Sequence, residues 1–359
     1  MALGGGTFIS QNKKLPGSYI NFASAQNASS SIGERGIAAM AIEMDWGKDG
    51  EIIEVTSQNF AKDSLKIFGY DYSHEKLKGL RDLFKNVKKA YFYRLNTGNK
   101  ATTDIATAKY SGTRGNDIRI VVAKNIDDDA KYDVITYLGT KEVDKQTVKE
   151  VSELLDNDYV TFSMETLEVT AGKSLEGGTN GDVSGEAHQN FLDKLESYQV
   201  NAVGCTAKDQ STSNLYVQYV KRLRDEQGIK FQVVLYNNAA NYEGVVNVKN
   251  STVEDESALV YWVTGVIAGC EINKSNTNKT YDGEYTINAD YTQAQLETSI
   301  DNGEFVLHKV GDEIRVLVDI NSLVDTTSEK GEVFKSNQTI RVLDQIASDV
   351  ASVFNSKYL

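Results

Sequence analysis

The sequence contains few residue patterns that could support catalysis or bind a metal. Its three histidines, His74, His188 and His308, lie far apart in the chain, and neither a His-Glu-x-x-His pattern nor the spacing of a zinc site occurs. His74 and His188 fall in the first turns of expected helices, where we expect solvated side chains. His308 lies on an expected strand, where a core or edge position is more common than a catalytic base. We predict no metal ligand among them.

Two other motifs match ligand sites only in part. Gly172-Lys-Ser174 has the end of a phosphate-binding loop, but Leu167 occupies the position of that loop's first glycine, which favours a flexible linker. The acidic run Asp127-Asp-Asp129 with Asp133 could attract Ca²⁺, but it lacks the alternating ligands that end in a distant Glu. A solvated hairpin turn is therefore favoured. With no Gly-x-Ser-x-Gly elbow either, we predict no catalytic, cofactor-binding or metal residues and a protein that is not an enzyme.

Composition argues against further classes of function. The 359 residues include 51 acidic and 38 basic side chains, a net charge of −13, and an acidic surface repels nucleic acid. Cys205 and Cys270 each adjoin an apolar stretch, which favours small buried residues over a disulfide framework. The longest apolar run, residues 258–268, is far shorter than the roughly 20 residues that cross a bilayer. No signal-peptide pattern follows Met1, so we expect a product of the host cytoplasm without a membrane span.

The first 31 residues differ from the rest of the chain. They are rich in Gly, Ser, Asn and Gln and cannot form a core of their own. After the single proline, the apolar residues Ile20 and Phe22 alternate with Tyr19 and Asn21. This pattern predicts an extended N-terminal arm or an edge strand, and a disordered tail is the alternative that these residues leave open.

Residues 32–96 alternate strands and helices, which indicates the first part of an α/β core. We expect a helix that begins after Ser73, a good N-cap residue, and a buried strand at residues 91–95. One face of this helix carries apolar residues at helical spacing. They are Leu77, Leu80, Leu83, Phe84 and Val87.

Short alternating segments separated by turn signals predict an all-β, β-sandwich-like domain at residues 97–171, with one short helix at 143–155. Five glycines make residues 172–185 an expected linker. Residues 186–359 return to alternating helices and strands, the second part of the α/β core, and end in a long amphipathic helix from 339 to 358. The apolar residues that share a face of this helix are Ile340, Leu343, Ile346, Val350, Val353 and Phe354. The predicted fold is an α/β core with an inserted β-sandwich-like domain and an extended N-terminal arm.

Several strings of the chain are long enough to be specific for one family. They are Lys66-Ile-Phe-Gly-Tyr-Asp-Tyr72, Gly112-Thr-Arg-Gly-Asn-Asp-Ile118, Leu259-Val-Tyr-Trp-Val-Thr-Gly265, Asn273-Lys-Ser-Asn-Thr-Asn-Lys-Thr-Tyr-Asp-Gly-Glu284, His308-Lys-Val-Gly-Asp-Glu-Ile314 and Asn337-Gln-Thr-Ile-Arg-Val-Leu-Asp-Gln345. All of them resemble the tail sheath proteins of contractile prophage tails and phage tail-like particles from Gram-positive bacteria. The likeness runs from the N-terminus to the last residue.

The resemblance implies a structural subunit that polymerises as stacked rings around an inner tube and contracts to drive that tube through a cell envelope. Implied partners are other copies of the chain, the inner tail tube protein, and baseplate and tail terminator proteins, with no nucleic acid and no membrane insertion. The product would be a virion tail or a phage tail-like particle. Neighbouring sheath subunits exchange arm strands by β-augmentation, which assigns Tyr19, Ile20 and Phe22 to contacts between subunits.

One departure from the family pattern concerns the end of the chain. Sheath proteins generally continue beyond the position of Lys357-Tyr-Leu359 with a helical and β segment that includes a C-terminal arm strand. Either the chain is a truncated form or the C-terminal arm is missing by nature, and in both cases we expect this chain to fold as a monomeric body that does not form the full mesh alone. Two alternatives remain open, namely another phage structural protein, such as a baseplate or surface-assembly component without contractile function, and a hydrolase whose carboxylates the sequence does not single out.

Overall fold

The computed structural model describes residues 35–358, so the expected arm with Tyr19, Ile20 and Phe22 lies outside the described residues. A seven-stranded sheet forms the centre of the core, and all neighbouring strands are parallel except the pair at one edge. In spatial order the strands are β14 (Glu304–Phe305), β13 (Val245–Val248), β12 (Gln232–Tyr236), β11 (Ala202–Cys205), β1 (Ile37–Ile42), β3 (Lys89–Arg94) and β2 (Ile52–Thr56).

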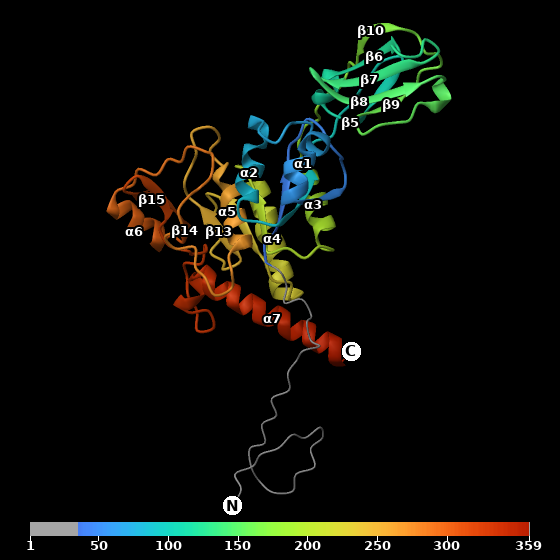
Figure 1. Cartoon of the computed structure of the whole chain (residues 1–359). Helices are drawn as coiled ribbons and strands as arrows, with labels where there is room; N and C mark the ends of the chain where they lie inside the picture. The colour runs from blue at the N-terminus through green and yellow to red at the C-terminus, as the bar shows by residue number, and fades with distance from the viewer. Residues whose placement is uncertain (1–34, 359) are drawn as a thin grey trace, which may run out of the picture.

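Helices cover both faces of this sheet (Figure 1). Since parallel strands are buried on both faces, their sequences are continuous apolar runs, and β1 with Ile-Ala-Ala-Met-Ala-Ile is such a run. Successive β1 residues point to opposite faces, so Met40 packs in one apolar cluster and Ala39 in the other. One face is covered by α1 (Ser57–Phe68), α2 (Lys78–Phe84) and α5 (Leu259–Gly269), and the other by α3 (Gly185–Leu195) and α4 (Gln210–Lys221).

The ends of α1 and α2 follow from local hydrogen bonding. Thr56 accepts a hydrogen bond from the Asn59 amide and caps α1, which ends at Gly69 in the left-handed region (φ 78°). The prediction that Ser73 caps the next helix is wrong. The ring of His74 accepts a hydrogen bond from the Lys76 amide, and a 3₁₀ turn (Glu75–Leu77) precedes α2.

Two antiparallel sheets make up the inserted domain, which extends away from the core at the upper right of Figure 1. They enclose a common apolar cluster that includes Ile118, Val134 and Val160. The first sheet contains β4 (Lys100–Thr102), β5 (Ala106–Ser111) and β9 (Val160–Phe162). The second contains β10 (Thr170–Ser174), β6 (Ile118–Lys124), β7 (Tyr132–Leu138) and β8 (Lys141–Val148).

Two expectations for this domain need correction. Residues 143–155 do not form a helix, because a tight turn at Gly139 (φ 63°) brings β8 back along β7, and only a 3₁₀ turn (Val151–Glu153) follows. The expected linker at 172–185 begins inside a strand, since β10 runs to Ser174 and pairs with β6. Sheet pairing overrides the local pattern in both places, with the preceding strand for β8 and with a strand about 50 residues earlier for β10.

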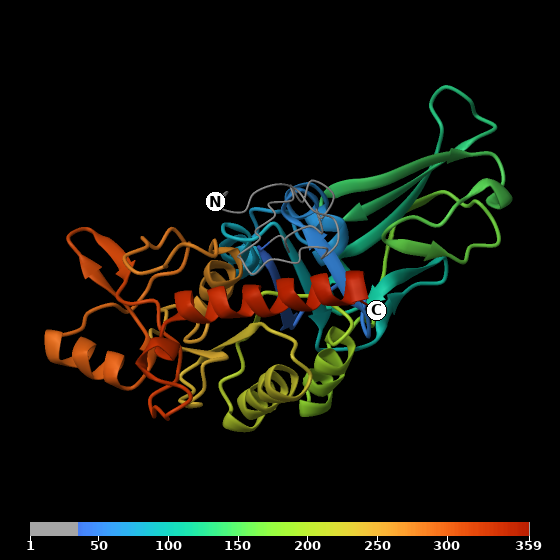
Figure 2. The same cartoon turned by 90° about the horizontal axis from the view of Figure 1, so that it is seen from below.

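The C-terminal part lies at the far end of the core. It contains α6 (Gln293–Asp301), which the sequence analysis did not identify, and a hairpin of β15 (Leu307–Val310) and β16 (Glu313–Val316) that turns at Gly311 (φ 62°). A 3₁₀ turn (Glu332–Lys335) leads to α7 (Asn337–Tyr358), which runs along the lower side of the body in Figure 1 and crosses in front of it in Figure 2, where the molecule is seen from below. No helix within residues 35–358 has the length and apolar character needed to span a membrane.

Candidate functional site

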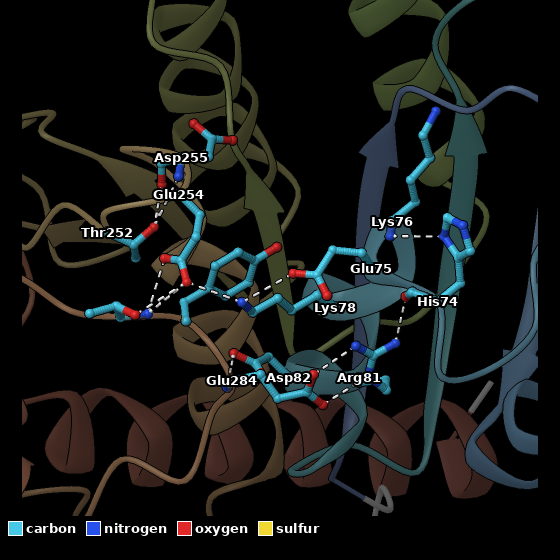
Figure 3. A network of polar contacts seen from close by, with 12 residues as sticks. His74, Glu75, Lys76, Lys78, Arg81, Asp82, Thr252, Glu254, Asp255 and Glu284 are labelled. Carbon is cyan, nitrogen blue, oxygen red and sulfur yellow. Dashed lines mark hydrogen bonds and ion pairs between the residues drawn. The ribbon is translucent and has the colours of Figure 1, made fainter.

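A polar network on α2 fixes the long connection between α5 and α6 (Figure 3). The carboxylate of Asp82 is fully buried and accepts hydrogen bonds from the backbone amide of Glu284, at 2.9 Å, and from the hydroxyl of Tyr281, at 3.0 Å. Burial raises the pKa of Asp82 to about 6, although both hydrogen bonds act in the opposite direction. Asp82 therefore holds residues 281–284 against α2 through a carboxyl group whose ionised form is made unfavourable by burial.

Arg81, the neighbour of Asp82, joins three segments. Its Nε and Nη2 donate to the two carboxylate oxygens of Glu284 at 2.8 and 2.7 Å, and its Nη1 donates to the carbonyl oxygens of Tyr72 and His74 at 2.7 Å each. The hydrogen bonds from Arg81 lower the pKa of Glu284. Such a two-pronged guanidinium–carboxylate contact sets orientation as well as distance. It fixes the connection from α5, the turn before α2 and α2 itself in one arrangement.

Lys78 extends the network toward the loop before α5. Its ammonium group lies 3.1 Å from the carboxylate of Glu254, which also accepts from the backbone amide of Thr286 at 3.1 Å. The carboxylates of Asp82, Glu284 and Glu254 are thus each engaged by a donor of another segment (Figure 3). General acid–base chemistry needs a carboxyl that can reach a substrate proton. The arrangement instead suits mechanical attachment of one segment to another.

A second set of contacts joins the core to the inserted domain at Asp45. Its carboxylate accepts hydrogen bonds from the Tyr70 hydroxyl, from the Lys76 ammonium group and, at 2.8 Å, from the Asn180 amide. Burial by itself raises the pKa of Asp45, but the hydrogen bonds from these three residues bring it below its usual value. Asp45 therefore stays ionised and connects the chain after β1 with the segment between α1 and α2 and with the chain that returns from the inserted domain.

Trp46, the next residue, belongs to the core chain but packs inside the inserted domain. It is fully buried there, stacked on Tyr159 with ring centroids 6.2 Å apart and edge-on to Tyr110 at 5.2 Å. Its indole nitrogen donates to the Lys66 carbonyl at 3.2 Å. A buried tryptophan contributes a large apolar area, so the two parts of the molecule share apolar core at this point.

Arg94 and Gly112 complete this junction. Arg94 at the end of β3 is 2% exposed, and its Nη1 donates to the carbonyl oxygens of Gly47 and Ser111 at 3.0 and 2.8 Å. Burial lowers the pKa of its guanidinium. Gly112 has φ 121° and passes so close to Asp45 that an added Cβ would lie 2.0 Å from the Asp45 carbonyl oxygen. Only glycine fits this position.

The expected linker also contributes to the junction. Asn116 donates to the Gly178 carbonyl and accepts from the Gly178 amide, both at 2.8 Å. A Cβ on Gly181 would lie 1.8 Å from the Thr97 carbonyl oxygen. The glycines at these two positions therefore allow the chain that leaves the domain to run tightly beside the chain that enters it.

The structure places the residues that sequence analysis considered for chemistry in structural roles. His188 is buried, contrary to the expected solvated position, and its Nδ1 lies 2.8 Å from the Tyr216 hydroxyl. Its pKa is lowered by burial. Gly172 and Ser174 belong to strand β10 and not to a loop. Asp133 is buried and contacts Asn125, Thr147 and Lys145, and no group of three or more potential ligands able to hold a metal occurs among the described residues.

A cavity of about 590 Å³ lies at the carboxyl ends of β1 and β11, the position where open parallel sheets commonly bind ligands. Three of the charged residues that line it have partners within the fold. Asp209 caps α4 by accepting from the Thr212 amide at 2.8 Å, and Lys208 forms an ion pair with Asp255 at 3.4 Å. Of the two cysteines, Cys205 is buried, with its thiol pKa raised to about 11 by burial, and Cys270 is partly exposed.

Consecutive parts of this chain match three domains of phage tail sheath proteins. Residues 35–95 match the tail sheath protein Gp18 domain III N-terminal region, residues 96–180 the phage tail sheath protein beta-sandwich domain, and residues 181–322 the phage tail sheath protein central domain. The phage-like element PBSX protein XkdK of Bacillus subtilis (strain 168) is 34% identical over 97% of this chain and 81% of its own length.

Solved structures agree with these matches. The sheath tail protein of Desulfitobacterium hafniense is 37% identical, with a TM-score of 0.84 over 95% of this chain and 83% of that one. The sheath tail protein of Listeria innocua is 34% identical, with a TM-score of 0.80 over 90% of this chain and 77% of that one.

The fold and its junctions define a structural assembly protein with an α/β body and a β-sandwich domain, and not an enzyme. This chain belongs to the family of phage tail sheath proteins. Some residues of the strings that resemble this family take part in the network on α2 or in the junction at Asp45. They include Tyr70, Gly112 and Glu284. The strings are recognisable in the sequence, but their contacts could not be predicted from it, because the partner residues are far away in the chain.

Proposed function

We propose that this chain is the subunit of a contractile tail sheath, which polymerises as stacked rings around an inner tube and contracts to drive the tube through a cell envelope. The observation that carries the proposal is the unbroken succession of three sheath domain matches over residues 35–322. The network on α2 and the junction at Asp45 support it, because a subunit that transmits force to its neighbours must resist deformation.

The proposed subunit has five parts. Residues 1–31 form an arm, and residues 32–96 and 185–359 form the α/β body. The inserted domain covers residues 97–174, since β10 runs to Ser174, and residues 175–184 connect it back to the body. In the polymer the inserted domain projects outward. The extension of this domain away from the core in Figure 1 supports that orientation.

The proposed arm connects neighbouring subunits. Tyr19, Ile20 and Phe22 have the alternating pattern of an extended strand, and such a strand can complete the hydrogen bonding of a sheet edge on another copy. A contact between different surfaces that does not close on itself propagates as a helix. The arm would keep subunits attached while the array changes from an extended to a contracted state.

Further proposed partners are the inner tail tube protein, the baseplate proteins and the tail terminator protein. Assembly takes place in the cytoplasm of the bacterial host, and the product is a virion tail or a phage tail-like particle. The net charge of −13 supports a surface that binds protein and does not bind nucleic acid.

Electron microscopy of the protein co-expressed with its tube protein tests this function. We expect hollow striated tubes, and discrete particles without tubes would instead support a baseplate component. A variant with Tyr19, Ile20 and Phe22 replaced by serine should stay folded and form no tubes. The matched control replaces Gln26, Asn27 and Asn21 by serine in the same segment. Normal tubes from the first variant would exclude the proposed role of these three side chains.

A further inference from the structure

The far half of α7 presents apolar side chains to solvent. Its first turns are fixed to the body, with Ile340 buried and Arg341 paired to Asp319 at 2.8 Å. Beyond them Leu343, Ile346 and Val350 are 41%, 55% and 63% exposed. The same face continues with Val353 and Phe354, which with Val350 and Asp349 line a shallow depression.

The spacing of these residues indicates a docking surface. Positions 343, 346, 350 and 353 alternate steps of three and four residues, the pattern of a helix that packs a narrow apolar seam against another apolar surface. We name this seam, Leu343, Ile346, Val350, Val353 and Phe354, the α7 face. A contiguous apolar patch on a soluble protein indicates a contact site.

The start of the described chain lies beside the first turns of the same helix. Arg35 donates from Nε to the Cys270 carbonyl at 2.8 Å and from Nη2 to the Ile267 carbonyl at 3.0 Å. Burial lowers the pKa of its guanidinium to about 10, and the positive charge of Arg341 in α7 acts in the same direction. Arg35 is therefore held close to Arg341, and the preceding 34 residues begin from that point.

Length and composition suit this segment to the α7 face. A chain of 34 residues spans up to about 110 Å when extended, whereas a helix of 22 residues is about 33 Å long. Residues 8–22 contain six large apolar residues, and the only charged side chains in residues 1–33 are Lys13 and Lys14, in a chain of net charge −13. The six are Phe8, Ile9, Leu15, Tyr19, Ile20 and Phe22.

We propose that in the free subunit the N-terminal segment docks on the α7 face of its own chain. A second copy is the weaker candidate, because the face offers five side chains, whereas a stable interface uses roughly 20–30 residues a side. An intramolecular segment needs less contact, since its tether supplies an effective concentration in the millimolar range. Docking covers apolar surface on the N-terminal segment and on the α7 face until the subunit assembles. The proposed contact does not depend on the function of the assembled particle.

Limited trypsin digestion of the full chain tests the proposal through cleavage after Lys13 and Lys14. Val350→Glu places a charge in the seam, and we expect it to speed cleavage about ten-fold, the factor for a loss of ~1.4 kcal/mol of docking free energy. Ser348→Glu adds the same charge outside the seam and should leave the rate unchanged. Circular dichroism verifies that both variants fold.

Equal cleavage rates in the wild type and in Val350→Glu would overturn the proposal. The same digestion at increasing protein concentration distinguishes docking of the chain's own N-terminal segment from docking of a second copy. Light scattering measures the oligomeric state at each concentration. A rate independent of concentration from a monomeric chain supports docking within one chain. Protection that grows with concentration and with a dimer would instead assign the α7 face to a second copy.

Discussion

Arg224 and Asp344 form a bidentate ion pair, with Nη1–Oδ2 and Nη2–Oδ1 distances of 2.7 Å each. Arg224 lies in the π-helical turn (Arg222–Glu226) that follows α4, is 5% exposed and also donates to the Phe231 carbonyl at 2.7 Å. Asp344 lies in α7. This pair therefore attaches the last helix to the layer formed by α4.

Replacing Asp344 should destabilise the fold strongly. Asp344→Ala leaves the charge of Arg224 buried without its partner, which costs about 3–5 kcal/mol in the free energy of unfolding, measured by urea denaturation. Asp349→Ala, on the same helix but bonded only to Gln345 among the described contacts, is the control and should cost under about 0.5 kcal/mol. A loss below about 1 kcal/mol in Asp344→Ala would show that the pair contributes little.

The pH dependence of stability should contain a contribution from Asp82. Its pKa of about 6 in the folded state lies above the ordinary 3.8, so the folded protein binds the proton more tightly than the unfolded chain. The resulting stabilisation is complete below the ordinary pKa of 3.8 and is lost as the pH rises from that value through about 6. Between pH 5.5 and 7.5 the wild type should lose roughly 1 kcal/mol relative to Asp82→Asn.

Urea denaturation of both proteins at the two pH values measures this difference. The comparison removes contributions that both proteins share, such as that of Glu284. The pKa of Glu284 is lowered in the fold, so this group stabilises the fold at pH values above its ordinary pKa. That stabilisation is lost as the pH falls. An identical pH response in the two proteins would contradict a raised pKa at Asp82.

The junction between the core and the inserted domain should not accept a side chain at position 112. Gly112→Ala combines φ 121° with a Cβ placed 2.0 Å from the Asp45 carbonyl oxygen, and we expect a loss above about 3 kcal/mol. Gly139→Ala is the control, since it also has positive φ (63°) but no atom within 4 Å of the added Cβ. That control should cost about 1 kcal/mol. Similar thermal unfolding temperatures for the two variants would refute the close approach.

Removal of the inserted domain should leave a folded core that carries an exposed tryptophan. The entering and leaving chains are adjacent, with the Thr179 amide donating to the Asn99 carbonyl at 3.2 Å, so residues 97–180 can be replaced by a short connection. The product should aggregate because Trp46 loses its apolar surroundings, and adding Trp46→Ser should restore a monomer on gel filtration. Loss of helical circular dichroism in both products would show that the core needs the domain to fold.

Local sequence patterns were sufficient for the main architecture. The alternating strands and helices of residues 32–96 and 186–359 predict an α/β core, and the periodic apolar residues of α2 predict its packing face. The β-sandwich-like domain followed from short alternating segments, and the domain match agrees with that prediction. These features depend on side-chain periodicity, which the sequence displays directly.

Tertiary contacts decided what periodicity could not. The helix predicted at residues 143–155 does not form, and residues 141–148 are strand β8, because β7 supplies hydrogen-bond partners along their length. His188 is buried because α4 brings Tyr216 beside it, 28 residues further along the chain.

Sequence and tertiary structure also contribute different information about chemistry and function. The sequence by itself determined that its histidines, glycines and acidic runs lack the spacing of a catalytic or metal site, and its family strings determined the class of protein. Only the tertiary structure showed what those strings contact, since Asp45 meets Asn180, and Arg81 meets Glu284, across 135 and 203 positions. Such pairs form when the folded chain brings distant residues together, and no local pattern contains that information.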